Sequence, residues 1–135
     1  MATWLLKTEP GTYSFAQLVR EKKAVWDGIR NPEARNNLRA ARKGDLALVY
    51  HTGSERAVVG IARITRAAYP DPADADWVAV DLAPVRALAH PVGLDVIKAE
   101  GRLADFVLVR RGRLSVVPVS DAELAVILAL GKTKL

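Results

Sequence analysis

Hydrophobic residues fall into short runs along this chain, and glycine, proline or small polar residues separate the runs. The first run, TWLLKT at residues 3–8, predicts a buried strand, and Glu-Pro-Gly at residues 9–11 predicts the turn that ends it. Ser14 and Gln17 have the spacing of a capping box, which favours the start of a short helix. The chain is therefore expected to begin with a strand, a turn and a helix.

A second helix is predicted to begin at Pro32. Asn31 can cap its first turn, and proline suits the first helical position. Small and apolar residues then recur at helical spacing, at Ala34, Leu38 and Ala41. The residues on a neighbouring face are basic: Arg35, Arg39, Arg42 and Lys43. This pattern predicts an amphipathic, basic helix.

The centre of the chain is rich in β-forming residues. Residues 46–51 and 58–64 predict an antiparallel pair joined by a polar loop at 52–56. The prolines and aspartates at 70–74 predict an exposed loop, and residues 77–82 predict a long strand that continues toward residue 88.

The C-terminal third mixes helices and strands. It predicts a short helix at 94–100, a buried segment at 106–109 of either type, and a strand at 114–119 whose proline favours a sheet edge or strand end. Ser120 and Glu123 form a second capping box, and Gly131 can end the helix that follows.

Strands in the middle with helices toward both ends predict an α+β fold, a mixed barrel or strongly curved sheet flanked by short helices. A length of 135 residues predicts one domain, residues 1–135. There is no apolar run of membrane-spanning length, no signal-peptide pattern and no cysteine, so a cytoplasmic protein is expected. The abundance of alanine and arginine is typical of a GC-rich bacterial genome.

The positive charge is concentrated in one segment. Residues 20–43 hold eight basic and three acidic side chains, whereas the rest of the chain holds twelve of each. A local excess of this kind favours binding to a polyanion, because cations displace the counterions of nucleic acid. A solvated, arginine-rich helix face is an equally good explanation of the charge alone.

Residues 25–38 combine groups that suit a planar polar ligand. Trp26 offers a stacking surface, asparagines can bond to a base edge, and arginines can contact phosphate, which favours a nucleobase site. Structural alternatives remain: Asp27 can close its own turn, and Arg30 can pair with Glu9 or Asp27. Trp4 and Trp77 fit strand packing better than a pocket.

Catalysis has little support in the pattern. His51, Ser54 and Asp45 could be arranged as a triad, but they lack nucleophile-elbow spacing. No phosphate-binding glycine motif occurs, and His51 and His90 lack metal-ligand spacing. We therefore expect no enzyme activity, no cofactor and no metal. A protein-interaction domain that uses the basic helix remains an alternative.

Several blocks closely resemble the EVE domain family, in the family's order and over nearly the full chain. The blocks are Trp4–Pro10, Tyr13–Phe15, Trp26–Asn31, Ala34–Leu38, Gly44–Asp45, Tyr50–His51 and Arg113–Val116. The resemblance implies a PUA-like fold, a small β-barrel with peripheral helices that is related to YTH domains. It also implies a reader of a modified base, modified cytosine in DNA above all, or of RNA modifications.

The resemblance also implies a site in which Trp26 stacks on or walls a flipped base. The implied base-pocket residues are Lys7, Thr8, Glu9, Trp26, Asp27, Asn31, Asn36, Tyr50, His51 and Ser115, and the implied phosphate-binding residues are Arg30, Arg35 and Arg39. Nucleic acid with a modified base is the implied partner. We expect a monomer with no membrane partner.

Two positions depart from the family pattern: Thr8 stands where serine is more usual, and Leu124 where tryptophan often occurs. The extra methyl group of Thr8 can change which base the pocket prefers.

Overall fold

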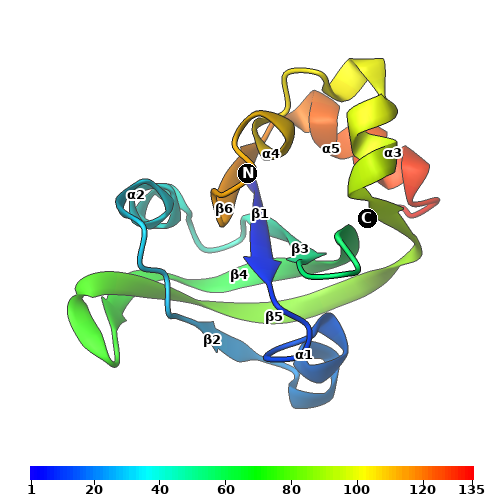
Figure 1. The fold of residues 1–135 in the computed structure, drawn as a ribbon. Coiled ribbons are helices and arrows are strands. Elements are labelled where there is room, and N and C mark those ends of the chain that lie inside the picture. Colours follow the sequence, from blue (N-terminus) through cyan, green and yellow to red (C-terminus); the bar gives the residue numbers. More distant parts are fainter.

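All six strands join one mixed sheet in the order β2-β5-β4-β3-β1-β6, as the computed structural model of residues 1–135 shows (Figure 1). The strands are β1 (Thr3–Thr8), β2 (Ala24–Trp26), β3 (Leu46–His51), β4 (Ala57–Asp71), β5 (Asp74–Gly93) and β6 (Val116–Val119). The helices are α1 (Phe15–Glu21), α2 (Pro32–Ala40), α3 (Leu94–Ala99), the 3-10 turn η1 (Gly101–Leu103), α4 (Val107–Arg110) and α5 (Asp121–Leu130). None of the helices is both long enough and apolar enough to cross a bilayer.

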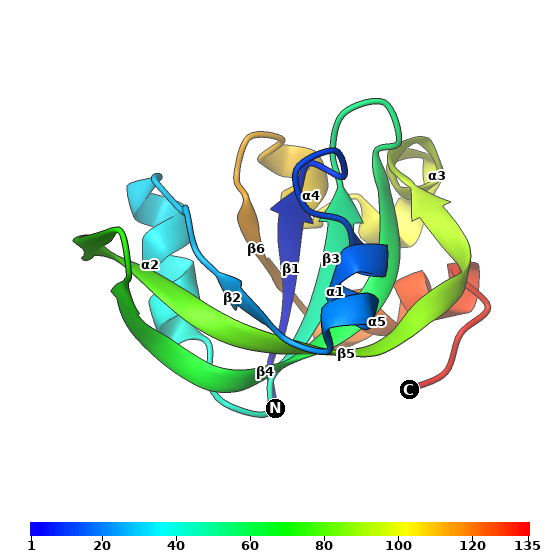
Figure 2. The same ribbon diagram turned by 90° about the horizontal axis from the view of Figure 1, so that it is seen from below.

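The long β4–β5 hairpin gives the sheet its curvature. Its pairing register shifts at five places, and such irregularities bend and twist a strand. Figure 2 shows the hairpin sweeping in an arc past β1 and β3, while β2 and β6 remain at opposite ends of the strand order. The predicted strongly curved mixed sheet with peripheral helices is confirmed.

β1 and β3 pair in parallel, and all other neighbouring strands pair antiparallel. The connection between these parallel strands carries α1, β2 and α2. It therefore brings the C-terminal end of β1 close to the tryptophan segment, which the sequence pattern could not establish.

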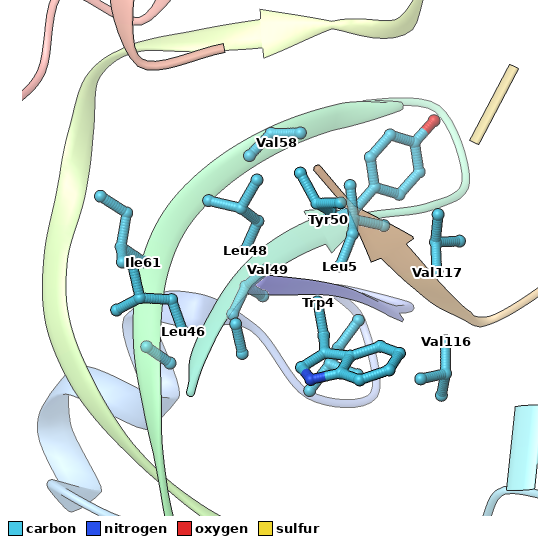
Figure 3. Packing of buried hydrophobic residues seen from close by; sticks show 14 of the residues in the cluster. Trp4, Leu5, Leu46, Leu48, Val49, Tyr50, Val58, Ile61, Val116 and Val117 are labelled. Atoms are coloured by element: carbon cyan, nitrogen blue, oxygen red, sulfur yellow. The ribbon is translucent and has the colours of Figure 1, made fainter. Parts of the chain in front are cut away.

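The core lies on both faces of the central strands. Leu5 and Trp4 point to opposite sides of β1, and Leu48 and Val49 do the same on β3 (Figure 3). Trp4 is buried, as predicted from its alternation with leucines. Gly60 on β4 lets the Phe15 ring pack close, because a Cβ at residue 60 would lie 2.5 Å from the ring.

A buried aspartate joins the starts of two central strands. One carboxylate oxygen of Asp45 accepts from the Ala2 N–H, and the other accepts from the indole Nε1–H of Trp4 and the Arg42 N–H, at 2.8 to 3.0 Å. Burial raises the pKa of Asp45, but the three donors outweigh that effect and hold the pKa below its usual value.

We expect Asp45→Asn to lower the free energy of unfolding by about 1–2 kcal/mol, because the amide must turn one NH₂ toward a donor that needs an acceptor. Urea unfolding measures the change. Asp105→Asn is the matched control, since that side chain is 92% exposed and should change stability little. Equal stability of both variants would contradict this role of Asp45.

Local signals located most elements, and the caps at Ser14, Asn31 and Ser120 all form. Only half of the first capping box exists, because Gln17 donates to Glu21 instead of returning to Ser14. Pro118 lies on an edge strand, as predicted.

Three expectations need correction. α2 ends at Ala40, so Arg42 and Lys43 lie beyond the helix that they were predicted to line. Residues 24–26 form a strand that was not predicted, because three residues are too few to show alternation. Asp71 is buried at the tip of the β4–β5 hairpin, where an exposed loop was predicted, because its carboxylate accepts bonds from another segment.

Candidate functional site

A cavity of about 630 Å³ lies where the end of β1 meets the chain that leaves β2. We call it the base cavity, after the ligand that the sequence predicts for these residues. β1 contributes one wall, the turn before α1 a second, and the segment from β2 to α2 a third. The lining residues are Lys7, Thr8, Glu9, Thr12, Tyr13, Val25, Trp26, Asp27, Gly28, Ile29, Arg30, Asn31 and Ser115.

Two aromatic rings meet at a right angle in this lining. The Trp26 and Tyr13 rings pack edge to face, with centroids 6.0 Å apart and planes at 84°. Trp26 is 7% exposed and is held by pairing with Val80 of β5, yet it borders the cavity. Its ring is thus fixed in place, which suits a rigid stacking surface. The sequence pattern had not singled out Tyr13 for this role.

Asp71 anchors the loop between β2 and α2. Its Oδ2 accepts from the Gly28 N–H and from Nη1 of Arg30, each at 3.0 Å, and its Oδ1 accepts from the Ala73 N–H at 2.8 Å. The backbone bonds from Gly28 and Ala73, with the Arg30 guanidinium, lower the pKa of Asp71 to about 2. Gly28 has a φ of 77°, a conformation that glycine adopts readily.

Arg30 therefore pairs internally, but with Asp71 rather than with Glu9 or Asp27. Its side chain remains 40% exposed and lines the cavity, so the pairing does not remove it from the cavity surface. Asp71 lies 41 residues away from Arg30 in the chain, and no local pattern connected the two.

The β1 end of the cavity is polar. The Lys7 ammonium donates to the Gly112 carbonyl at 2.7 Å, and burial lowers the pKa of Lys7. The Thr8 hydroxyl donates to the Tyr13 carbonyl at 2.7 Å, so this hydroxyl fixes the turn beside the cavity. Glu9 accepts from the Gly11 N–H, and the Ser115 carbonyl accepts from the Lys7 N–H.

Asp27 and Asn31 complete the lining from the loop. The Asn31 Oδ1 accepts from the Ala34 N–H at 3.0 Å as the cap of α2, which leaves its NH₂ group for other contacts. The exposed Asp27 side chain makes no hydrogen bond or ion pair within the chain, so it does not close its own turn. Its carboxylate is an acceptor on the cavity wall.

Three predicted pocket residues lie outside the base cavity. Asn36 is exposed on α2, because it lies on the side of the helix opposite the buried Ala34 and Leu38. Tyr50 lines a different cavity. His51 is buried beneath α1, where its Nε2 accepts from the Phe15 N–H at 3.0 Å and its Nδ1–H faces Glu55 at 2.8 Å.

These bonds also contradict the hypothetical triad. Neither ring nitrogen of His51 contacts Ser54 or Asp45, and the Asp45 carboxylate is occupied by Trp4 and two backbone groups. His51 instead positions the start of α1.

The basic residues of the segment 20–43 fall into two groups along the chain. One group lies on and just after α1 and the other on and around α2, and these two helices lie at separate places on the sheet in both views (Figures 1 and 2). Near α2, the guanidinium carbons of Arg30 and Arg35 lie 5.6 and 5.0 Å from the Trp77 ring centre. Trp77 thus contacts two arginines, a role that the sequence pattern did not indicate. Arg39 is exposed without an intramolecular partner.

Comparison with known proteins supports one assignment over nearly the whole length. The EVE domain model matches residues 2–130. Mouse thymocyte nuclear protein 1 is 32% identical, over 97% of this chain and 74% of that protein. Rpa0253 from Rhodopseudomonas palustris has a TM-score of 0.93 at 42% identity, over 98% of this chain and 94% of its own. Human THYN1, solved in complex with 5-methylcytosine-containing DNA, has a TM-score of 0.90 at 29% identity and full coverage of both chains.

Proposed function

This chain belongs to the EVE domain family and has its PUA-like fold, and we propose that it is a non-catalytic nucleic-acid-binding module that reads a modified base. The proposed ligand is nucleic acid that contains modified cytosine, and DNA is favoured over RNA. The structural likeness to human THYN1, which was solved with 5-methylcytosine-containing DNA, supports this assignment.

The single observation that carries the proposal is the aromatic-walled cavity beside Trp26. A volume of about 630 Å³ falls within the range of small-molecule sites and leaves room for one nucleotide. Stacking on a fixed aromatic ring contributes about 1–3 kcal/mol per base, and extracting a base from a duplex costs about a few kcal/mol. Hydrogen bonds and phosphate contacts must supply the remainder.

The lining suits cytosine in particular. A carboxylate can accept from the exocyclic amine of cytosine, and Asp27 offers one without an internal partner. Val25 and Ile29 provide apolar surface for a methyl group. Because one methyl group in an apolar slot contributes about 1–3 kcal/mol, we expect selectivity of about tenfold or more between methylated and plain cytosine.

The direct test measures binding to oligonucleotides that differ at one position: cytosine, 5-methylcytosine or 5-hydroxymethylcytosine. Fluorescence anisotropy gives the affinity for DNA and RNA strands of the same sequence, and so compares both the bases and the two backbones. A modified DNA strand should bind most tightly. Equal affinity for all bases would overturn the reader function, and tighter binding of the RNA series would reassign the module to RNA.

Arg39 gives a cleaner test of phosphate contact than Arg35, which stacks on Trp77. We expect Arg39→Gln to weaken binding to modified and plain strands equally. It should also reduce the slope of log affinity against log salt by about 0.7 for a single strand, because one fewer phosphate is neutralised. Arg86→Gln is the control, since Arg86 is exposed on β5 and lines neither this cavity nor the next. An unchanged salt slope for Arg39→Gln would exclude this contact.

A further inference from the structure

A second cavity, of about 430 Å³, adjoins the base cavity. The two share four lining residues, Lys7, Thr8, Glu9 and Ser115, so the end of β1 forms the wall between them. The far side of the second cavity comes from the β3–β4 turn and from the segment between α4 and β6. Two groups of one ligand could therefore occupy the two cavities, on either side of the end of β1.

The second cavity is cationic. Lys7, Arg56 and Arg113 line it, and Glu9 is its one carboxylate. Glu9 already accepts from the Gly11 N–H at 3.1 Å and lies 3.4 Å from the Thr52 hydroxyl. Neither Arg56 nor Arg113 has a side-chain hydrogen bond or ion pair within the chain, although several other arginines do, such as Arg102 with Glu100. Two guanidinium groups thus line this cavity without a carboxylate partner of their own.

The backbone presents Arg56 in an unusual way. Its φ of 44° lies in the left-handed region, which costs energy for a residue with a Cβ. The Leu94 N–H donates to the Arg56 carbonyl at 2.8 Å and stabilises this conformation. Strain of this kind is common where a side chain is directed toward a ligand. The Tyr50 ring lies on the same wall, 5.8 Å from the Lys7 ammonium.

We propose that the second cavity binds the backbone phosphate next to the base held in the base cavity, with Arg56 and Arg113 as its main cationic contacts. Guanidinium groups bind phosphate oxygens with charge-assisted bonds, which explains two unpaired arginines in one hollow. The inference rests on the proposed function, because the phosphate belongs to the bound strand. It implies that the module recognises a nucleotide within a chain rather than a free base.

Lys7 connects the two cavities. Burial lowers the pKa of its ammonium, and an anion placed beside it would offset that loss of solvation. Since Lys7 also lines the base cavity, the test variants leave it intact.

The experiment uses a DNA strand with one 5-methylcytosine and a single neutral methylphosphonate linkage, placed in turn on each side of that base or four nucleotides away. Anisotropy titrations give the affinity of the full-length protein for each strand. In the wild type, one flanking substitution should weaken binding about tenfold, and the distant substitution should have little effect. A free phosphate ion could bind to the same arginines as a backbone phosphate, so inorganic phosphate is titrated in a separate experiment without DNA.

Arg56→Gln combined with Arg113→Gln should weaken binding to the native strand about tenfold and should remove the response to the flanking methylphosphonate. Glutamine carries the same Cβ as arginine, so it adds no new backbone strain at residue 56. Arg86→Gln should respond as the wild type does. Preference for 5-methylcytosine over cytosine should persist in the double variant.

A double variant that still responds to the flanking linkage would overturn the phosphate site, as would a wild type that responds to no flanking linkage. Saturable binding of inorganic phosphate without a linkage effect would do the same. Failure of the reader function has a separate signature, because the wild type would then show equal affinity for 5-methylcytosine and cytosine in the same titrations.

Discussion

Replacing Trp26 with alanine is expected to abolish the preference for a modified base and to weaken binding to the modified strand by about 10- to 100-fold, the equivalent of about 1–3 kcal/mol of base stacking. The Trp26 ring is fixed by the Tyr13 edge contact and by the pairing of β2 with β5. Its removal takes the larger of the two aromatic rings out of the lining of the base cavity. Anisotropy on matched modified and plain oligonucleotides measures the ratio.

Removal of a nearly buried indole also costs stability, about 3–5 kcal/mol for tryptophan to alanine in a core. Circular dichroism and urea unfolding must therefore show that the variant is folded at the assay temperature. Trp26→Phe keeps an aromatic face and should retain most of the preference. Asp27→Asn provides a readout independent of packing, because this exposed carboxylate should affect preference for cytosine without affecting the fold. A folded Trp26→Ala variant with the wild-type ratio would remove Trp26 from the recognition surface.

Asp71→Ala is expected to lower the free energy of unfolding by about 3 kcal/mol and to weaken modified-strand binding at the same time. The change leaves three donors, the Gly28 N–H, the Ala73 N–H and the Arg30 guanidinium, without their carboxylate acceptor. A hydrogen bond to a charged group contributes about 1.5–3 kcal/mol. The Arg30 contribution is reduced, because solvent reaches that side chain. Urea unfolding and anisotropy measure the two effects.

The weaker binding expected for Asp71→Ala has a structural reason. Without Asp71, the loop that carries Asp27 and Arg30 loses its attachment to the β4–β5 hairpin, so the cavity wall becomes less ordered. Asp71→Asn keeps one acceptor oxygen and should have a smaller effect on both measurements. Destabilisation with unchanged affinity for the modified strand would separate the loop anchor from ligand binding.

The same carboxylate predicts a pH dependence. The folded-state pKa of Asp71 is about 2, against an ordinary value of 3.8, so folding favours the ionised form. Its stabilisation is complete above about pH 4 and is lost as the pH falls through about 2. Urea unfolding of the wild type should therefore show falling stability across this range, and Asp71→Asn should flatten the curve. An unchanged slope would contradict the bonding seen around Asp71.

Local sequence signals predicted much of the fold because they act within one element. Asn31 and Pro32 mark the start of α2, and the alternation around Trp4 places its ring in the core. Pro118 indicates an edge because proline lacks the N–H that a second neighbouring strand would need.

Part of the cavity lining follows from residues that lie close together in the sequence. Lys7, Thr8 and Glu9 at the end of β1 and Trp26, Asp27 and Asn31 around the second turn do line one cavity, together with Ser115. Side-chain direction decided which of the other predicted residues lie away from this cavity. Tyr50 and His51 are adjacent on β3 and face opposite ways, and neither reaches the base cavity.

The sequence by itself determined most of the elements, the caps and the buried stripes, since these depend on residues within a few positions of one another. Only the tertiary structure decided that Asp71 secures the Gly28 loop, that Tyr13 meets Trp26 at an edge, and that Trp77 supports Arg30 and Arg35. Each of these contacts joins different elements. Their formation depends on the curvature of the β4–β5 hairpin and on the parallel pairing of β1 with β3, which short-range patterns do not encode.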